Sequence, residues 1–286
     1  MLSRHILVLS GVAILLAALI VGAAERPPAT GTPAREQTAS PEATPAPALP
    51  KISYGSCHVD GPYVAMTFDD GPSAENTPRL LNILKERDIK ATFFMIGENA
   101  ARLPEIVKQV LADGHEIGNH SWSHPLLAKM TDDAVREELQ KTQDAIVQAS
   151  GYTPRLLRPP YGGFTARQRA WANATFGFKI IFWDVDPLDW KILNSAHVKA
   201  EILKQTKPGS IILSHDIHKT TVDAMPQTLD TLLANGFKFV TVSQLIAMDR
   251  PLEPKPKLEL DAPQSPPPAQ PPAAPTAAPA PPPRAS

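Results

Sequence analysis

The sequence is poor in cysteine and has no excess of either charge. Cys57 is the one cysteine among 286 residues, so the chain can form neither an intrachain disulfide nor a metal site built from several thiolates. Lysine and arginine total 28 against 29 aspartates and glutamates, which leaves a net charge of -1. A chain without net positive charge has no electrostatic basis for binding nucleic acid, so we expect no nucleic-acid partner.

Proline is scarce in the middle of the chain and abundant on both sides of it. Residues 25–50 hold 7 of the 32 prolines and residues 251–286 hold 14, which leaves 11 for the rest. Both flanks lack the large apolar residues that a core needs, so we expect them to be disordered and rich in proline and alanine. The composition therefore predicts a linker over 25–51, a single folded domain over 52–250 and a tail over 251–286.

The first 24 residues are typical of an export signal. Arg4 and His5 precede an apolar run over 6–21, and three small residues follow at 22–24. The run is also long enough for a retained membrane anchor over residues 6–24. Both alternatives predict an exported domain, located in the periplasm or cell envelope or secreted.

Short apolar runs alternate with segments of helical periodicity throughout the predicted domain. We expect strands over 63–68, 91–96, 115–118, 156–157, 179–185, 210–213 and 237–242. We expect helices over 77–87, 104–112, 131–151, 166–176, 196–204 and 225–234. Buried strands that alternate with helices indicate a parallel sheet, and the sequence has no nucleotide-binding glycine fingerprint to favour an open sheet. The pattern predicts an α/β fold, a (β/α) barrel of about seven parallel strands.

Two adjacent carboxylates end the first of these strands. Asp69 and Asp70 follow an apolar run and precede the turn formed by Gly71 and Pro72. A charged pair at the end of a buried strand is costly unless a metal or a cation compensates it. The pair could alternatively begin a turn or cap the next helix.

Other polar residues follow four further strands: His120, Arg158, Asp189 and His215. In a barrel, the loops after the strands meet at one end, so these side chains are expected to converge. His120 and His124 have the spacing of a metal-binding pair, and one aspartate would complete a three-ligand set suited to zinc or another divalent metal. The second aspartate could then act as a base and His215 as an acid in hydrolysis. We assign no role to His115, His197 and His218.

Five segments resemble, in order, the five motifs of the polysaccharide deacetylases, carbohydrate esterase family 4. They are Thr67-Phe-Asp-Asp-Gly-Pro72, His120-Ser-Trp-Ser-His124, Arg158-Pro-Pro-Tyr161, Asp186-Pro-Leu-Asp189-Trp190 and Leu213-Ser-His215. The resemblance spans about residues 64–245 and departs from the family pattern at no motif position. It implies a distorted (β/α) barrel and a metal-dependent hydrolase that releases acetate from N-acetylglucosamine units of a polysaccharide such as peptidoglycan or chitin.

The resemblance also implies a role for each residue at the metal. Asp70, His120 and His124 would be the ligands of the metal, usually zinc, with cobalt or nickel as alternatives. Asp69 would be the general base, and Arg158 would pair with it and orient it.

The remaining motif residues would bind the substrate and supply the acid. The backbone N–H of Tyr161 would help to bind the oxyanion. His215 would be the acid, with Asp189 hydrogen-bonded to it. Trp190 and Leu213 would line the pocket for the acetyl methyl group.

Two alternative functions remain open from the sequence. An amidohydrolase of the same fold could act on another amide, and a non-catalytic glycan-binding module could use the same barrel. Such a module would be expected to lack a metal ligand, the base or the acid, and this sequence lacks none of them. We expect a monomer.

Overall fold

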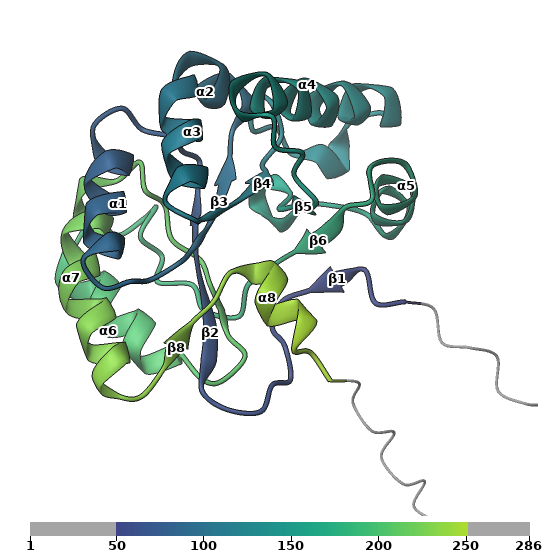
Figure 1. Ribbon diagram of the computed structural model, residues 1–286. Coiled ribbons are helices and arrows are strands. Elements are labelled where there is room, and N and C mark those ends of the chain that lie inside the picture. The colour runs from purple at the N-terminus through teal and green to yellow at the C-terminus, as the bar shows by residue number, and fades with distance from the viewer. Residues whose placement is uncertain (1–49, 251–286) are drawn as a thin grey trace, which may run out of the picture. The chain divides into compact units, whose positions relative to one another are not determined.

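The computed structural model describes residues 50–250, which form a curled α/β barrel (Figure 1). The predicted signal or anchor over 1–24, the linker up to residue 49 and the tail over 251–286 lie outside the described residues. Within residues 50–250, the helices are too short or too polar to cross a membrane.

The barrel wall is a parallel sheet with the strand order β1-β6-β5-β4-β3-β2-β7, and β8 pairs with β2. The strands are β1 (Ser53–Tyr54), β2 (Tyr63–Asp69), β3 (Thr92–Met95), β4 (Glu116–Asn119), β5 (Leu156–Leu157), β6 (Lys179–Ile181), β7 (Ile211–Ile212) and β8 (Lys238–Phe239). Beyond β6, Val185 forms a single parallel bridge with Ile212, which brings the two sides of the curled sheet together. The predicted distorted barrel is confirmed. About seven strands were predicted, and the short strand β1 is the additional, eighth strand.

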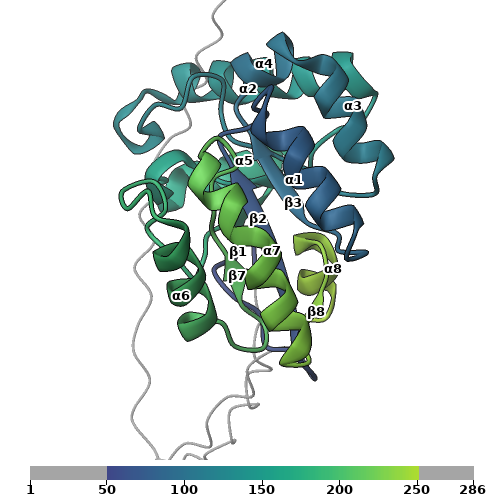
Figure 2. The same cartoon turned by 90° about the vertical axis from the view of Figure 1, so that its left-hand side faces the viewer.

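Helices cover the outside of this wall (Figures 1 and 2). They are α1 (Asn76–Lys85), α2 (Gly97–Arg102), α3 (Pro104–Ala112), α4 (Asp132–Ser150), α5 (Ala166–Phe176), α6 (Ser195–Gln205), α7 (Lys219–Ala234) and α8 (Val242–Ala247). Helices α6, α7 and α1 pack side by side over one part of the sheet, and α2, α3 and α4 form a second group. Parallel strands need this cover because both faces of a parallel sheet are apolar.

The end of the described domain differs from the prediction. A strand was expected over 237–242, whereas β8 ends at Phe239 and α8 begins at Val242. The Thr241 side chain accepts a hydrogen bond from the Gln244 backbone, and the Gln244 side chain accepts one from the Thr241 backbone. This capping box starts a helix where apolar residues alone suggested a longer strand. Helix α7 also begins at Lys219, earlier than predicted. The apolar periodicity did not indicate this start because the first turn of the helix is polar.

Strand β2 lies at the centre of the fold, between β3 and β7. Six of its seven residues are buried, and Met66 and Phe68 belong to the largest apolar cluster. Burial of an apolar side chain of this size contributes about 1.5–3 kcal/mol. The strand is therefore a rigid support for Asp69 at its carboxyl end.

Candidate active site

The predicted polar residues meet at the carboxyl ends of the strands. They surround a cavity of about 320 Å³. Its lining consists of Asp69, Asp70, His120, His124, Pro159, Tyr161, Trp183, Asp186, Trp190, Leu213 and His215. Arg158 and Asp189 are the two predicted site residues that do not line it; both are fully buried and each contacts a lining residue. The structure thus brings together every residue that the sequence selected.

Three ligand atoms converge on one side of the cavity. Asp70 Oδ1 lies 3.3 Å from His120 Nε2 and 3.4 Å from His124 Nε2. Ligand atoms of a tetrahedral zinc with bonds of about 2.0–2.1 Å are roughly 3.3 Å apart. Asp70 Oδ1 is buried and makes no hydrogen bond to any of the described residues. A carboxylate oxygen in that position fits a divalent metal ion.

Asp70 is also in the protonation state that a metal ligand needs. Burial alone would raise the pKa of its carboxyl group, but the adjacent imidazole of His120 and the nearby imidazoles of His215 and His124 lower this pKa to about 2. Asp70 is therefore ionised at neutral pH.

The two histidine rings are held differently. His120 Nδ1 lies 2.7 Å from the backbone oxygen of Arg158, which fixes the ring with Nε2 toward Asp70. The His124 ring packs edge-on against the rings of His120 and Tyr161, with centroids 4.9 and 4.6 Å away. The second ligand thus depends on ring packing and on its own loop.

Asp69 is paired with a buried arginine. Its Oδ1 accepts a hydrogen bond from Arg158 Nη1 at 2.7 Å, and the two side chains are 3% and 0% exposed. Arg158 also donates to Thr67 Oγ1 at 2.6 Å and to the backbone oxygen of Phe182 at 3.2 Å. The second carboxylate oxygen of Asp69 lies 3.7 Å from His120 Nε2. The positive charge of Arg158 thereby compensates the negative charge of Asp69, and the hydrogen bond orients the Asp69 carboxylate beside the three ligand atoms.

His215 is held by Asp189 on another side of the cavity. Asp189 Oδ1 lies 2.7 Å from His215 Nδ1, and Oδ2 accepts hydrogen bonds from the His215 backbone and from Thr221 Oγ1, both at 2.8 Å. Burial lowers the pKa of His215, but the hydrogen bond and charge of Asp189 outweigh it and raise the pKa to about 9. The His215 imidazole is therefore protonated at neutral pH and can donate a proton from Nε2.

Three other predicted residues form the rim and wall of the cavity. Tyr161 and Trp190 are 70% and 53% exposed, whereas Leu213 is buried. Tyr161 has a φ of 58°, unusual for a residue other than glycine, and the turn sets its backbone at the cavity. Their roles toward an oxyanion and an acetyl methyl group stay predictions. The sequence did not single out Trp183, which lies within the apolar run expected as a strand over 179–185.

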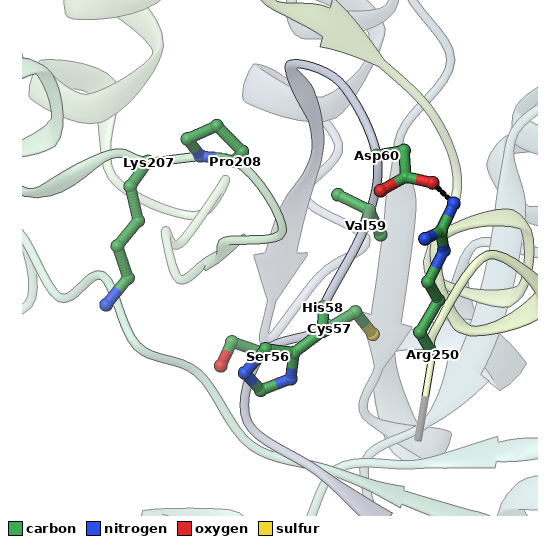
Figure 3. A pocket seen from close by; sticks show the side chains of 8 residues that line it. All are labelled: Ser56, Cys57, His58, Val59, Asp60, Lys207, Pro208 and Arg250. Carbon is green, nitrogen blue, oxygen red and sulfur yellow. Dashed lines mark ion pairs between the residues drawn. The ribbon is translucent and has the colours of Figure 1, made fainter. Parts of the chain in front are cut away.

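A second cavity lies at the opposite end of the barrel, near the start of β7 (Figure 3). Cys57 lies there, and its backbone N–H donates to the Gly209 oxygen at 2.9 Å. Burial raises the pKa of the Cys57 thiol to about 11, so the thiol is protonated and unreactive at neutral pH. Asp60 and Arg250 pair across its edge (Figure 3). These groups offer no equivalent of the three converging ligand atoms.

Comparison with known proteins identifies the family. The model of the family described as polysaccharide deacetylase matches residues 58–180. A peptidoglycan-N-acetylglucosamine deacetylase of Bacillus cereus is 42% identical over 193 residues, which cover 65% of this chain and 70% of that protein. The chain belongs to the polysaccharide deacetylase family. The family predicted from the sequence is thereby confirmed.

Other polysaccharide deacetylases share the fold and part of the sequence. The peptidoglycan-N-acetylmuramic acid deacetylase PdaC of Bacillus subtilis is 40% identical over 192 residues, which cover 67% of this chain and 40% of that protein. The crystal structure of the Bc1960 peptidoglycan N-acetylglucosamine deacetylase superposes with a TM-score of 0.67 at 38% identity, covering 70% of this chain and 96% of that one. These relatives are named deacetylases, which are hydrolases that act on a carbon–nitrogen bond other than a peptide bond.

Proposed function

We propose that this chain is a metal-dependent deacetylase that removes the N-acetyl group from N-acetylglucosamine units of peptidoglycan. One observation carries the proposal. Three ligand atoms, a carboxylate base held by Arg158 and a protonated acid held by Asp189 share one cavity. The relatives named for peptidoglycan support the choice of polymer, and the name of PdaC makes N-acetylmuramic acid the alternative sugar.

The side chains divide the hydrolysis among them. A divalent metal held by Asp70, His120 and His124 would polarise the acetamide carbonyl and lower the pKa of a coordinated water. Asp69 takes the proton of the attacking water, and the Tyr161 backbone N–H donates to the carbonyl oxygen as it gains charge.

Breakage of the carbon–nitrogen bond requires an acid. His215 transfers its Nε2 proton to the departing nitrogen, so the sugar leaves as a neutral amine and acetic acid remains, which releases its own proton to water and becomes acetate at neutral pH. Asp189 stabilises the protonated imidazole until this step. Water and amide are thus converted to amine and acetic acid, with one proton accepted by Asp69 and one supplied by His215.

The proposal is tested by mass spectrometry of acetate loss from peptidoglycan fragments and chito-oligomers offered side by side. We expect deacetylation of the peptidoglycan fragments, its loss on chelation and its recovery with added zinc or cobalt. Binding of glycan without acetate release in the presence of both metals would instead favour the glycan-binding module. Deacetylation of neither polymer would favour an amidohydrolase acting on another amide.

Asp189→Asn is expected to move the basic limb of the pH–rate profile to lower pH. His215 acts as an acid only when protonated, and Asp189 extends its protonated range up to a pKa of about 9. Without that charge, the limb should fall by up to about 2.5 pH units, toward the ordinary histidine pKa of about 6.5. The measurement is kcat/KM against pH, with the melting temperature as a check on folding. The control Asp223→Asn, at a surface aspartate paired with Lys219, should leave the limb in place, and an unshifted limb in Asp189→Asn would contradict the assignment.

Export of the enzyme is part of the proposal. The composition of residues 1–24 supports passage to the cell envelope, where peptidoglycan lies, with residues 6–24 as a membrane anchor or as a removable signal. Intact mass of the protein recovered from membrane and soluble fractions distinguishes the two. We propose a monomer whose flanking segments act as spacers.

A further inference from the structure

The loop between β4 and α4 carries two of the three proposed metal ligands in a conformation that needs support. Ser121 has a φ of 62° and His124 a φ of 61°, in the left-handed region that residues with a side chain avoid. The carbonyl oxygens of Ser121 and Trp122 accept hydrogen bonds from the first N–H groups of α2. The loop N–H groups require acceptors elsewhere.

The N–H groups of Ser121 and His124 donate to Asn119 Oδ1 and Ser121 Oγ. Glu138, on helix α4, supplies the acceptors for the two N–H groups between them. Its Oε2 accepts hydrogen bonds from the backbone N–H of Trp122 at 2.8 Å and of Ser123 at 2.9 Å. Its Oε1 accepts a hydrogen bond from Ser123 Oγ at 2.9 Å. One carboxylate therefore holds the middle of the segment that joins His120 to His124.

His124 is the ligand that depends on this support. His120 is fixed by the backbone oxygen of Arg158 on its Nδ1, whereas His124 Nδ1 has no hydrogen-bond partner among residues 50–250. Ring packing against His120 and Tyr161 constrains His124 from the sides. The distance of 3.4 Å from its Nε2 to Asp70 Oδ1 is therefore set by the loop backbone together with this ring packing.

We propose that Glu138 is a positioning residue for the metal site: it holds the loop so that His124 meets the ion together with Asp70 and His120. The inference rests on the proposed metal dependence. Glu138 acts through the backbone of Trp122 and Ser123. Its removal lets the loop relax and places His124 less well for metal binding.

The experiment measures zinc binding by the full chain, stripped of metal, in competition with a chromophoric chelator. Glu138→Ala should weaken zinc affinity by about 10–100-fold, the effect typical of residues that orient metal ligands. Glu138→Gln should remain close to the unsubstituted protein, because its oxygen can accept from both N–H groups and its amide can donate to Ser123 Oγ. The visible absorption of bound cobalt should change in Glu138→Ala and be restored in Glu138→Gln.

Glu137→Ala is the matched control. Glu137 is the neighbouring residue of α4, is exposed, and pairs with Lys141 at 2.7 Å. This variant should bind zinc like the unsubstituted protein. If Glu138→Ala does not fold, Glu138→Asp replaces it, because a side chain shorter by one carbon cannot reach all three donors and should weaken zinc binding.

The outcomes separate this inference from the proposed function. Zinc affinity unchanged in a folded Glu138→Ala or Glu138→Asp would overturn the positioning role and leave the deacetylase proposal intact. Equal loss of affinity in Glu138→Ala and Glu138→Gln would also overturn it, since negative charge rather than hydrogen bonding would then control the site. An unsubstituted chain that binds no zinc, cobalt or nickel would overturn the metal dependence as well.

Discussion

Replacement of Asp69 by asparagine is expected to lower kcat by about 10²–10⁴-fold, the usual contribution of a general base. Asparagine has nearly the same shape, and its amide oxygen can still accept the hydrogen bond that Arg158 Nη1 now donates to Asp69 Oδ1. The amide cannot take a proton from water, so the fold and the bound metal should be retained while turnover is lost. The measurements are kcat and the zinc content of the purified variant.

Asp70→Asn is the informative companion to this variant. Asp70 supplies the carboxylate oxygen that faces both His120 and His124, so its neutralisation should lower zinc content as well as turnover. The contrast separates two adjacent aspartates that the sequence alone could not tell apart. Full activity of Asp69→Asn would show that another group is the base.

Arg158→Met is expected to lower the free energy of unfolding by about 3–5 kcal/mol, because it leaves the carboxylate of Asp69 buried without its cation. Arg158 is fully buried and its 2.7 Å contact with Asp69 is shielded from solvent. The measurement is urea unfolding with chelator present, so that metal binding does not contribute.

Two further variants identify the cause of this loss. Arg167→Met breaks an exposed pair with Asp132 and should change the free energy of unfolding by less than about 1 kcal/mol. The double variant with Asp69→Asn and Arg158→Met should be more stable than Arg158→Met alone, because the unpaired charge is gone. If the double variant is no more stable, the loss comes from the packing of Arg158 against the Phe94 ring instead.

Much of the site could be predicted because parallel strands place their carboxyl ends at one rim. Asp69, His120 and His215 lie at the carboxyl ends of three different strands, and this position alone indicated that they would meet. The adjacent aspartates could be separated only by family resemblance, since their different partners are reached through the tertiary structure.

Other parts of the site left no local signal. Trp183 belongs to the apolar run over 179–185, which suggested a buried strand residue. The structure ends β6 at Ile181, and Trp183, beyond the strand, lines the cavity. Glu138 looks like any exposed charge of an amphipathic helix, and its contact with the metal-site loop spans fifteen residues of sequence. The boundary of α8 was hidden for a different reason, because the capping box at Thr241 lies within a run that also suits a strand.

The single bridge between Val185 and Ile212 marks the seam where the barrel closes without a regular strand pair. Two backbone hydrogen bonds cross this seam, from Asp184 N–H to the Ile211 oxygen at 3.2 Å and from Leu213 N–H to the Val185 oxygen at 2.9 Å, and two aspartate side chains add to them. Asp184 Oδ1 accepts from the Ile211 backbone at 2.9 Å, and Asp189 Oδ2 accepts from the His215 backbone at 2.8 Å. Asp189 is thus the hydrogen-bond partner of the proposed acid and also links the two sides of the seam. If the barrel opened at this seam, Asp189 would separate from His215, and the imidazole would lose the charge that keeps it protonated.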